Sequence, residues 1–306
     1  MGKVTIVGSY STGLFFTGDV LPKPGETVPG NSFFEGPGGK GSNQLITAHI
    51  MGADVQFVAR IGKDDYGQKA LNMYKEYGIP TDLIRIDEDE PTSIGAILVD
   101  KDGNNLINIV SGANGKLSYF DIDEAIPYIK DSFVVGFQLE TPVDTVSYAI
   151  KKLSTLGVHT LLDPAPAIPL PEDIYPFIYY LKPNEHEATT LSGLHVFDIE
   201  TAKAACNWFL EKGVHTVIIT LGEQGAVIAV GNEYIYVPAP KVNTVDSTGA
   251  GDCFSGTMMA RLAAGDSIKS AVEFASVSAA ISTTKLGVVN AIPSVSEVEK
   301  FMEENK

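Results

Sequence analysis

The chain has 306 residues, 44% of them hydrophobic, so it can bury a large core in one sizeable domain. Its formal net charge of −16 excludes the basic face that nucleic acid or an anionic membrane would need as a partner. Two cysteines, Cys206 and Cys253, provide no disulfide framework. The first apolar run, residues 4–7, is too short for a signal peptide or a membrane span. We therefore expect a cytoplasmic protein without nucleic-acid or membrane partners.

Strand-like and helix-like patterns alternate along the chain. Short apolar runs predict strands at 4–7, 55–60, 133–139, 159–162, 178–181, 216–220 and 226–230. Helical periodicity predicts helices at 40–51, 66–77, 143–156, 199–211, 250–263 and 268–284. This alternation indicates an α/β fold with a central, mainly parallel sheet flanked by helices on both faces.

Two helix-poor segments, 14–34 and 94–110, interrupt the alternation. The second predicts a hairpin whose turn is Asp102, Gly103, Asn104 and Asn105. We expect both segments to contribute strands to a small β-sheet lid inserted into a single α/β domain that spans 1–306.

Four polar or small residues lie at or just past the ends of predicted strands. They are Glu140, Asn184, Thr220 and Gly222. Ligands of such sheets gather at the carboxyl ends of the strands, so these residues are expected to share one crevice.

The stretch from Asp246 to Gly256 is the most informative about chemistry. Gly249, Ala250 and Gly251 present almost no side chain where a predicted helix begins, and bare amides at a helix N-terminus favour an anion. Asp252 places a carboxylate in the same turn. A base beside an anion site suggests phosphoryl transfer to a hydroxyl. The alternative is an acidic residue that only caps the helix.

A second glycine-rich segment, Gly36 to Gly41, matches the dinucleotide-binding fingerprint in its spacing. That motif should follow the first strand directly, whereas here the first strand ends far upstream. A dinucleotide oxidoreductase is therefore a distant alternative.

Residues 246–252 resemble the signature D-T-x-G-A-G-D of the ribokinase-like (phosphofructokinase-B) family of sugar and nucleoside kinases, with Ser247 in the place of Thr. Further matching segments follow in family order and span nearly the whole chain. They are P-G-E-T-V-P-G-N at 24–31, G-G-K-G-S-N-Q at 38–44, Q-L-E at 138–140, D-P-A-P at 163–166, K-P-N-E-H-E at 182–187 and T-L-G at 220–222.

The resemblance implies an ATP- and Mg²⁺-dependent kinase with Asp252 as the general base and Gly249, Ala250 and Gly251 as its anion hole. Asn184 and Glu187 match the motif that organises Mg²⁺ and phosphate, although a helix cap with an acidic first turn explains that pair equally well. The positions that match the nucleotide site are Asn184, Thr220, Leu221, Gly222, Gly225, Gly251 and Ser276.

The resemblance also implies a K⁺ site that supports the anion hole. Its matched ligands are Asp246, the backbone of Thr248, Ser282 and the carbonyls of Lys285, Gly287 and Ala291. In the family the lid closes over the sugar and often forms a dimer contact, so a homodimer through the lid is expected.

The matched sugar-binding positions are Ser11, Gly13, Gly39, Lys40, Asn43, Glu140 and Asp252. Gly13 departs from the family, which has a sugar-gripping Asp there, and losing that acceptor should weaken ribose recognition. Either the substrate lacks a hydroxyl of ribose, or Ser11 or Tyr10 recognises that hydroxyl through water.

The sequence thus predicts phosphorylation of a primary hydroxyl of a small sugar or sugar derivative. Because Gly13 leaves room for a larger substituent, a nucleoside kinase is the alternative within the class. A non-catalytic sugar-binding relative is the alternative outside it, and the intact Asp252 counts against that reading.

Overall fold

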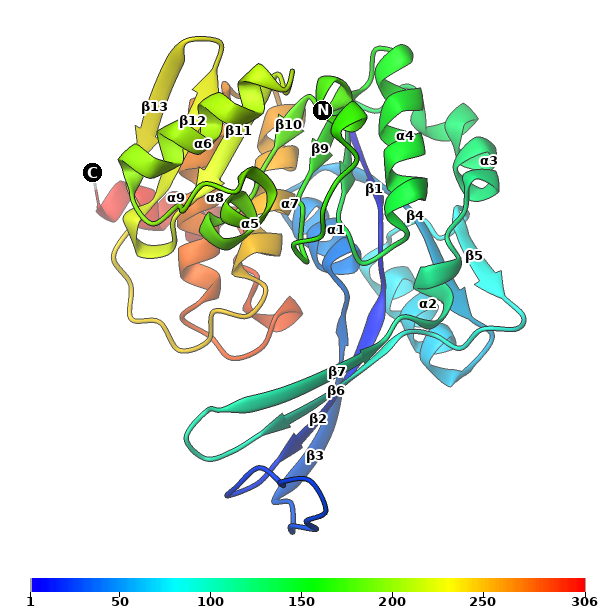
Figure 1. Ribbon diagram of the computed structural model, residues 1–306. Helices are drawn as coiled ribbons and strands as arrows, with labels where there is room; N and C mark the ends of the chain where they lie inside the picture. Colours follow the sequence, from blue (N-terminus) through cyan, green and yellow to red (C-terminus); the bar gives the residue numbers. More distant parts are fainter. Residues whose placement is uncertain (1, 306) are drawn as a thin grey trace.

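Strand β1 (Lys3–Val7) lies inside a nine-stranded sheet in the computed structural model, which describes residues 2–305 (Figure 1). Its other strands are β4 (Asp54–Gly62), β5 (Ile84–Asp87), β8 (Val134–Phe137), β9 (His159–Leu162), β10 (Tyr180–Leu181), β11 (Thr216–Thr220), β12 (Ala226–Val230) and β13 (Glu233–Val237). Their order is β13-β12-β11-β10-β9-β8-β1-β4-β5. Neighbours from β11 to β5 pair in parallel, and β12 and β13 are antiparallel at one edge, which confirms the mainly parallel sheet.

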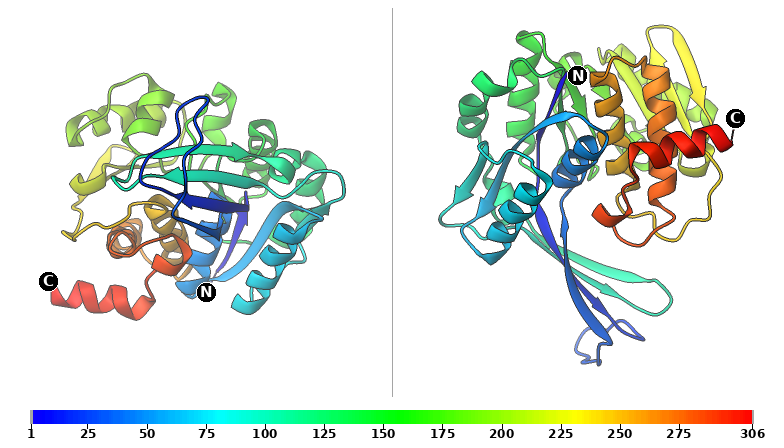
Figure 2. Two further views of the ribbon diagram at one scale, coloured as in Figure 1. Left: turned by 90° about the horizontal axis from the view of Figure 1, so that it is seen from below. Right: turned by 180° about the vertical axis from the view of Figure 1, so that it is seen from behind.

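Helices cover both faces of this sheet (Figure 2). One face carries α1 (Lys40–Ile50), α2 (Asp65–Tyr77), α7 (Ala250–Ala263), α8 (Ile268–Ser282) and α9 (Val295–Glu304). The other carries α3 (Tyr119–Ile129), α4 (Val143–Thr155), α5 (Glu185–Ser192) and α6 (Ile199–Glu211). Short 3₁₀ helices form at Gly112–Lys116, Glu172–Phe177, Gly222–Gln224 and Val289–Ala291.

Two hydrophobic cores form because successive side chains of a strand point to opposite faces of the sheet. In β1, Val4 and Ile6 pack into the core under α1 and α7, while Val7 packs into the core under α3 and α4. All three are fully buried. Burial on both faces explains why the strands read as continuous apolar runs.

A second, four-stranded sheet extends away from this body (Figure 1). It contains β2 (Ser11–Thr17), β3 (Ser32–Gly38), β6 (Ile94–Val99) and β7 (Asn105–Val110), in the order β3-β2-β6-β7. The small β-sheet that the sequence predicts is therefore present. The range 14–34 was inaccurate, because strands begin and end outside it and residues 18–31 connect them without strand structure.

The hairpin of β6 and β7 closes on the side chain of Asp100. Its carboxylate accepts hydrogen bonds from the backbone N–H groups of Asp102 and Asn104, at 3.0 and 2.9 Å. Gly103 takes a φ of 83°, which glycine adopts without strain. The expected turn was one residue too long, since Asn105 already pairs with Val99 as part of β7.

Five predicted elements have the observed bounds: residues 159–162, 216–220, 226–230, 199–211 and 250–263. Elements that the prediction omitted include α3, α9, β5 and β13. Helix α3 contains Pro127, which usually indicates a helix end. Strand β5 has four residues, too few for a clear alternating pattern.

No helix within residues 2–305 combines the length and the apolar character that crossing a bilayer would demand.

Aromatic rings stack on one another at the first residue of β9 and at the residues that directly precede β10 and β11. The Tyr179 ring lies between His159 and His215, with centroids 3.8 and 4.0 Å away. Burial, with a smaller contribution from the charge of His215, lowers the pKa of His159 below its ordinary 6.5. Folding therefore favours the neutral imidazole, and protonation opposes it.

We predict that the free energy of unfolding falls as pH drops below about 6.5, because the unfolded chain binds this proton more readily than the folded one. His159→Phe preserves the ring stack and should reduce the loss of Tm between about pH 7.5 and pH 5.5. The matched control is His186→Gln, at an exposed position of α5. Equal losses of Tm in His159→Phe and wild type would contradict this assignment.

Candidate active site

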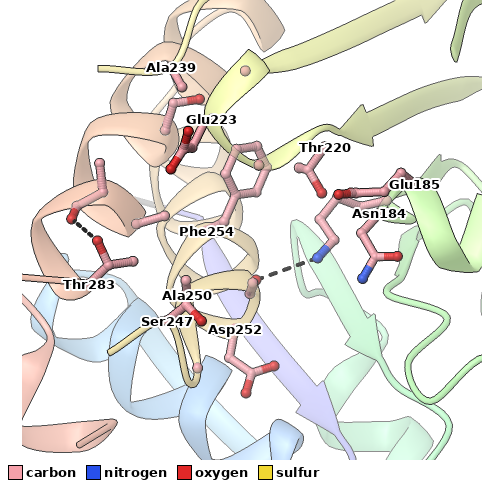
Figure 3. Close-up of a pocket in the computed structure, with 18 of the residues that line it drawn as sticks. Asn184, Glu185, Thr220, Glu223, Ala239, Ser247, Ala250, Asp252, Phe254 and Thr283 are labelled. Atoms are coloured by element: carbon pink, nitrogen blue, oxygen red, sulfur yellow. Dashed lines mark hydrogen bonds between the residues drawn. The ribbon is translucent and has the colours of Figure 1, made fainter. Parts of the chain in front are cut away.

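A cavity of about 690 Å³ opens between the first turn of α7, helix α8 and the carboxyl ends of β10 and β11 (Figure 3). Asp252, Ala250 and Ser247 lie on its α7 side, and Thr220 of β11 faces them together with Asn184 and Glu185 at the start of α5. Predicted residues that line the cavity are Lys40, Asn184, Glu187, Thr220, Gly222, Gly225, Gly249, Ala250, Gly251, Asp252 and Ser276.

Helix α7 begins with a glycine cap that leaves its amides accessible. Gly249 has a φ of 77°, and a Cβ there would stand 2.4 Å from Val288 Cγ1, so glycine is required twice over. Because glycine has no side chain, no side-chain hydrogen bond caps the first turn of α7. The Ala250 N–H donates to the Ser247 carbonyl at 3.2 Å, and the N–H of Gly251 follows in the first turn, where a helix offers no internal acceptor. An anion placed here would meet these amides and the positive end of the helix dipole.

Asp252 is buried beside this turn, with an exposed fraction of 4%. Its Oδ2 accepts from Asn43 Nδ2 at 2.9 Å, and its Oδ1 lies 3.4 Å from Gln44 Nε2 and 3.9 Å from Lys40 Nζ. Burial raises the pKa of Asp252 above its ordinary value, the Lys40 ammonium opposes that rise, and the nearby carboxylate of Asp163 adds to it. A carboxylate with a raised pKa is a better proton acceptor.

The predicted sugar residues of α1 meet Glu140 at the start of that helix. Glu140 Oε2 accepts from the Ser9 hydroxyl at 2.5 Å and from the Lys40 backbone N–H at 2.8 Å. Gly39 turns the chain into the helix with a φ of 89°, and a Cβ on it would lie 2.8 Å from the Ser11 backbone nitrogen. Asn43 and Lys40 therefore reach Asp252, while Glu140 and Gly39 shape the start of the helix that carries them.

Gly13 lies on β2 beneath an aromatic ring. A Cβ at this position would stand 2.7 Å from Phe15 Cε2 and 3.4 Å from Ile97 Cδ1, and the φ of Gly13 is not positive. The Phe15 ring stacks on Phe34, with centroids 4.7 Å apart. The space above Gly13 is therefore filled by an apolar side chain rather than left open as expected.

Both proposed substitutes for the missing carboxylate already make an internal hydrogen bond. The Tyr10 hydroxyl bonds to Thr12 Oγ1 at 3.2 Å inside the core, where Tyr10 is 3% exposed, so the idea that Tyr10 recognises the sugar is wrong. The Ser11 hydroxyl bonds to Ser93 Oγ at 2.7 Å.

Asn184 and Glu187 form a reciprocal cap at the start of α5. The Glu187 N–H donates to Asn184 Oδ1, and the Asn184 backbone and side-chain amides donate to the Glu187 carboxylate, all at 2.8 to 3.0 Å. Burial raises the pKa of Glu187, and the Lys182 ammonium opposes that shift. Both residues also line the cavity, so the cap holds a carboxylate in place there.

The expected nucleotide positions divide into lining and supporting residues. Thr220 pairs with Asn184 as an isolated parallel bridge. Gly225 has a φ of 96°, and a Cβ there would lie 2.1 Å from the Val237 carbonyl, so only glycine fits. Leu221 is buried at 4% exposure behind the cavity wall.

Three of the residues expected around K⁺ lie together. Asp246 accepts from the backbone N–H groups of Thr248 at 2.9 Å and Gly287 at 3.0 Å. Burial would raise the pKa of Asp246, but these hydrogen bonds outweigh it and lower the pKa.

The other three expected ligands have different partners. Ser282 Oγ donates to the Ala279 carbonyl at 2.7 Å, Lys285 Nζ pairs with Glu297 at 3.1 Å, and Ala291 is 1% exposed in a 3₁₀ turn. These contacts concern side chains and burial, so the Lys285 and Ala291 carbonyls expected as ligands stay a prediction.

Sequence reasoning missed a buried polar network beneath the cavity. Gln44 Nε2 donates to Asp163 Oδ2 at 3.0 Å, Gln138 Nε2 donates to Gln44 Oε1 at 2.6 Å, and Lys182 Nζ pairs with Asp163 Oδ2 at 2.9 Å. Asp163 and Lys182 each come directly after an observed strand, which is the signal that could have identified them.

Among residues 2–305, no cluster of three or more His, Cys, Asp or Glu side chains is arranged to hold a metal ion by itself.

Comparisons with known proteins agree with this geometry. The model of the pfkB family of carbohydrate kinases matches residues 1–295. The chain is 35% identical to ribokinase of Haemophilus influenzae, covering 98% of each protein, and 31% identical to deoxyribokinase of Salmonella typhi, covering 99% of each. The structure of Arabidopsis thaliana ribokinase complexed with ribose and ATP superimposes with a TM-score of 0.91 at 27% identity, covering 99% of both chains. The chain belongs to the pfkB family of carbohydrate kinases and has the ribokinase fold.

Proposed function

We propose that this ATP-dependent sugar kinase transfers the γ-phosphate of ATP to a primary hydroxyl of a small sugar, with Asp252 as the general base. One observation carries the proposal: a buried carboxylate at the N-terminus of α7 lies in the cavity wall and also bonds to Asn43 of α1. The same carboxylate therefore adjoins both an anion site and a set of polyol contacts. A non-catalytic sugar-binding relative has no need of such a base.

In this mechanism the sugar hydroxyl gives its proton to Asp252 as its oxygen bonds to the γ-phosphorus. The bond from that phosphorus to the bridging oxygen breaks, and its electron pair leaves with ADP. The amides of Gly249, Ala250 and Gly251 stabilise charge on the transferring group. For Ala250 this means exchanging its turn contact to Ser247 for the phosphate.

The residues of the cavity fit a bound divalent cation. Its lining includes the five carboxylates of Asp163, Glu185, Glu187, Glu223 and Asp252, against the ammonium groups of Lys40 and Lys182. Such a cavity repels the phosphates of ATP unless a cation neutralises the charge. We assign Mg²⁺ to the Asn184 and Glu187 side, where it supplies charge neutralisation and keeps most of its water shell.

The substrate follows from the environment of Gly13. With Phe15 over this position, a hydroxyl pointing there would lose hydrogen bonds to water and gain none. We propose a sugar that lacks a hydroxyl at this point, such as a deoxypentose, or that carries an apolar group there. The relatives include a deoxyribokinase at 31% identity and ribokinases at 35%, so the support for this class comes from the Phe15 ring and not from the identities.

We also propose K⁺ activation and a homodimer. The charged Asp246 carboxylate supports a monovalent cation beside the anion hole. Large apolar side chains with exposed fractions of 42 to 59% support a partner subunit on the small sheet: Phe16, Phe33, Phe34, Leu106, Ile107, Ile109 and Val110.

Replacing the base should separate binding from chemistry. We expect Asp252→Asn to keep ADP affinity and to lower kcat by about 10²–10⁴-fold, because the amide preserves shape but cannot accept the proton. Wild-type kcat/KM should fall as pH drops through the raised pKa of Asp252. Near-normal kcat in Asp252→Asn would remove Asp252 from this role.

Glu187→Gln tests the cation site. The new amide places an N–H donor against the donating Asn184 side chain, so some loss of Tm is expected together with a higher Mg²⁺ requirement and a lower kcat. The KM for sugar should stay within about threefold. Glu297→Gln, at the similarly capped start of α9, controls for cap loss. If the Mg²⁺ titration of Glu187→Gln overlays that of the wild type, Glu187 only caps α5.

A third substitution addresses selectivity. Gly13→Asp alone collides with the Phe15 ring, so we compare Phe15→Ala with the double variant Gly13→Asp/Phe15→Ala. The added carboxylate should raise kcat/KM for ribose over the best other sugar by about tenfold or more, as a charge-assisted hydrogen bond predicts. A wild type that already prefers ribose would contradict this explanation of the pocket.

A further inference from the structure

Lys182 and Asp163 form an ion pair at the floor of the cavity. Their Nζ and Oδ2 atoms are 2.9 Å apart, and the side chains are 3% and 2% exposed. The backbone sets this pairing, because the Lys182 N–H donates to the Leu162 carbonyl and continues the parallel pairing of β9 and β10 by one residue. Burying two charges is costly where apolar side chains would serve, so the pair calls for a role.

The ammonium of Lys182 points toward the anion site. Its Nζ lies 3.5 Å from the Gly251 carbonyl oxygen, and 3.6 Å from the point where a Cβ on Gly251 would stand. An ammonium has three N–H donors. Asp163 and the Gly251 carbonyl take two, which leaves one for an oxygen atom in the cavity that both Lys182 and Gly251 line.

The charge balance of the cavity makes this donor important. Among the residues 2–305 that line it, Lys40 and Lys182 are the cationic side chains. Lys40 Nζ lies 3.9 Å from Asp252 Oδ1 and begins α1, on the sugar side. Lys182 is therefore the cation at the end of the cavity where α7 presents its amides.

We propose that Lys182 is a further catalytic residue, which donates a hydrogen bond to a non-bridging oxygen of the γ-phosphate during transfer. Asp163 is a positioning residue that holds the ammonium there. This inference rests on the roles proposed above for Asp252 and the α7 amides. Lys182 keeps its proton throughout: the sugar proton goes to Asp252, the new bond joins the sugar oxygen to phosphorus, and the electron pair of the broken bond leaves with ADP.

If the ion pair of Lys182 and Asp163 had a purely structural role, its loss would have different effects. Loss of the pair would lower Tm, and it would weaken the binding of the substrates in the ground state as much as in the transition state. A donor to the transferring group instead affects the transition state selectively.

The test compares Lys182→Met with Lys182→Arg, using the best substrate of the wild type. We expect Lys182→Met to lower kcat by about 10²–10³-fold, as loss of one oxyanion donor does, with the Kd of Mg·ADP changed by less than about threefold. Affinity for ADP–aluminium fluoride with bound sugar should fall by a factor similar to that in kcat. Arginine should restore part of kcat. A folded Lys182→Met enzyme with kcat within about threefold of the wild type would overturn the inference.

Asp163→Asn tests the positioning role. It should lower kcat in the wild type but by less than about threefold in the Lys182→Met background, because it acts through the lysine. A further large loss of kcat in the Lys182→Met background would overturn the positioning role of Asp163. Ser255→Ala removes another hydrogen bond to the same Asp163 oxygen, 2.8 Å long, and is the matched control. Lys182→Met alone could leave the buried Asp163 charge without its partner and fail to fold. In that case the double variant Lys182→Met/Asp163→Asn, which leaves no unpaired buried charge, is compared with the wild type instead.

These results also separate the two proposals. A wild type that phosphorylates no sugar, or an active Asp252→Asn, refutes the proposed function. If Asp252→Asn is inactive while Lys182→Met is normal, only the inference about Lys182 fails.

Discussion

The close approach of α1 and α7 is the constraint on which the site depends. A Cβ on Gly256 would lie 2.5 Å from the Gln44 carbonyl oxygen, so the two helices meet where no side chain separates them. At this distance Asn43 and Gln44 reach Asp252 from the neighbouring helix. The approach thus buries the carboxylate, raises its pKa and joins α1 to the first turn of α7.

The parallel sheet supplies the other half of the arrangement. Asp163, Lys182 and Thr220 stand at the carboxyl ends of three adjacent strands, so the sheet itself brings them to the edge that the helix N-terminus faces. Positive and negative groups therefore lie side by side: the amides and the Asp252 carboxylate of α7, and the ammonium of Lys182 from the sheet edge. A sugar kinase needs this arrangement because it must hold an anionic donor and still remove a proton beside it.

The sequence allowed the fold class to be predicted, as well as the residues that gather around one cavity, because both depend on local patterns. Bare glycines before a helix predicted the anion site, and strand ends predicted the crevice. Contacts between distant segments could not be predicted. The Phe15 ring over Gly13, the internal bond of Tyr10 and the ion pair of Asp163 with Lys182 exist only after folding.

The most direct test of the account is a comparison of ATP-dependent phosphorylation by the wild-type enzyme, measured as ADP release with Mg²⁺ and K⁺ present. The substrates are ribose, 2-deoxyribose, other pentoses, hexoses and nucleosides. We expect sugar-dependent ADP release, with kcat/KM for a sugar that lacks one hydroxyl of ribose at least about tenfold above that for ribose. Turnover with nucleosides alone, or a preference for ribose itself, would contradict it.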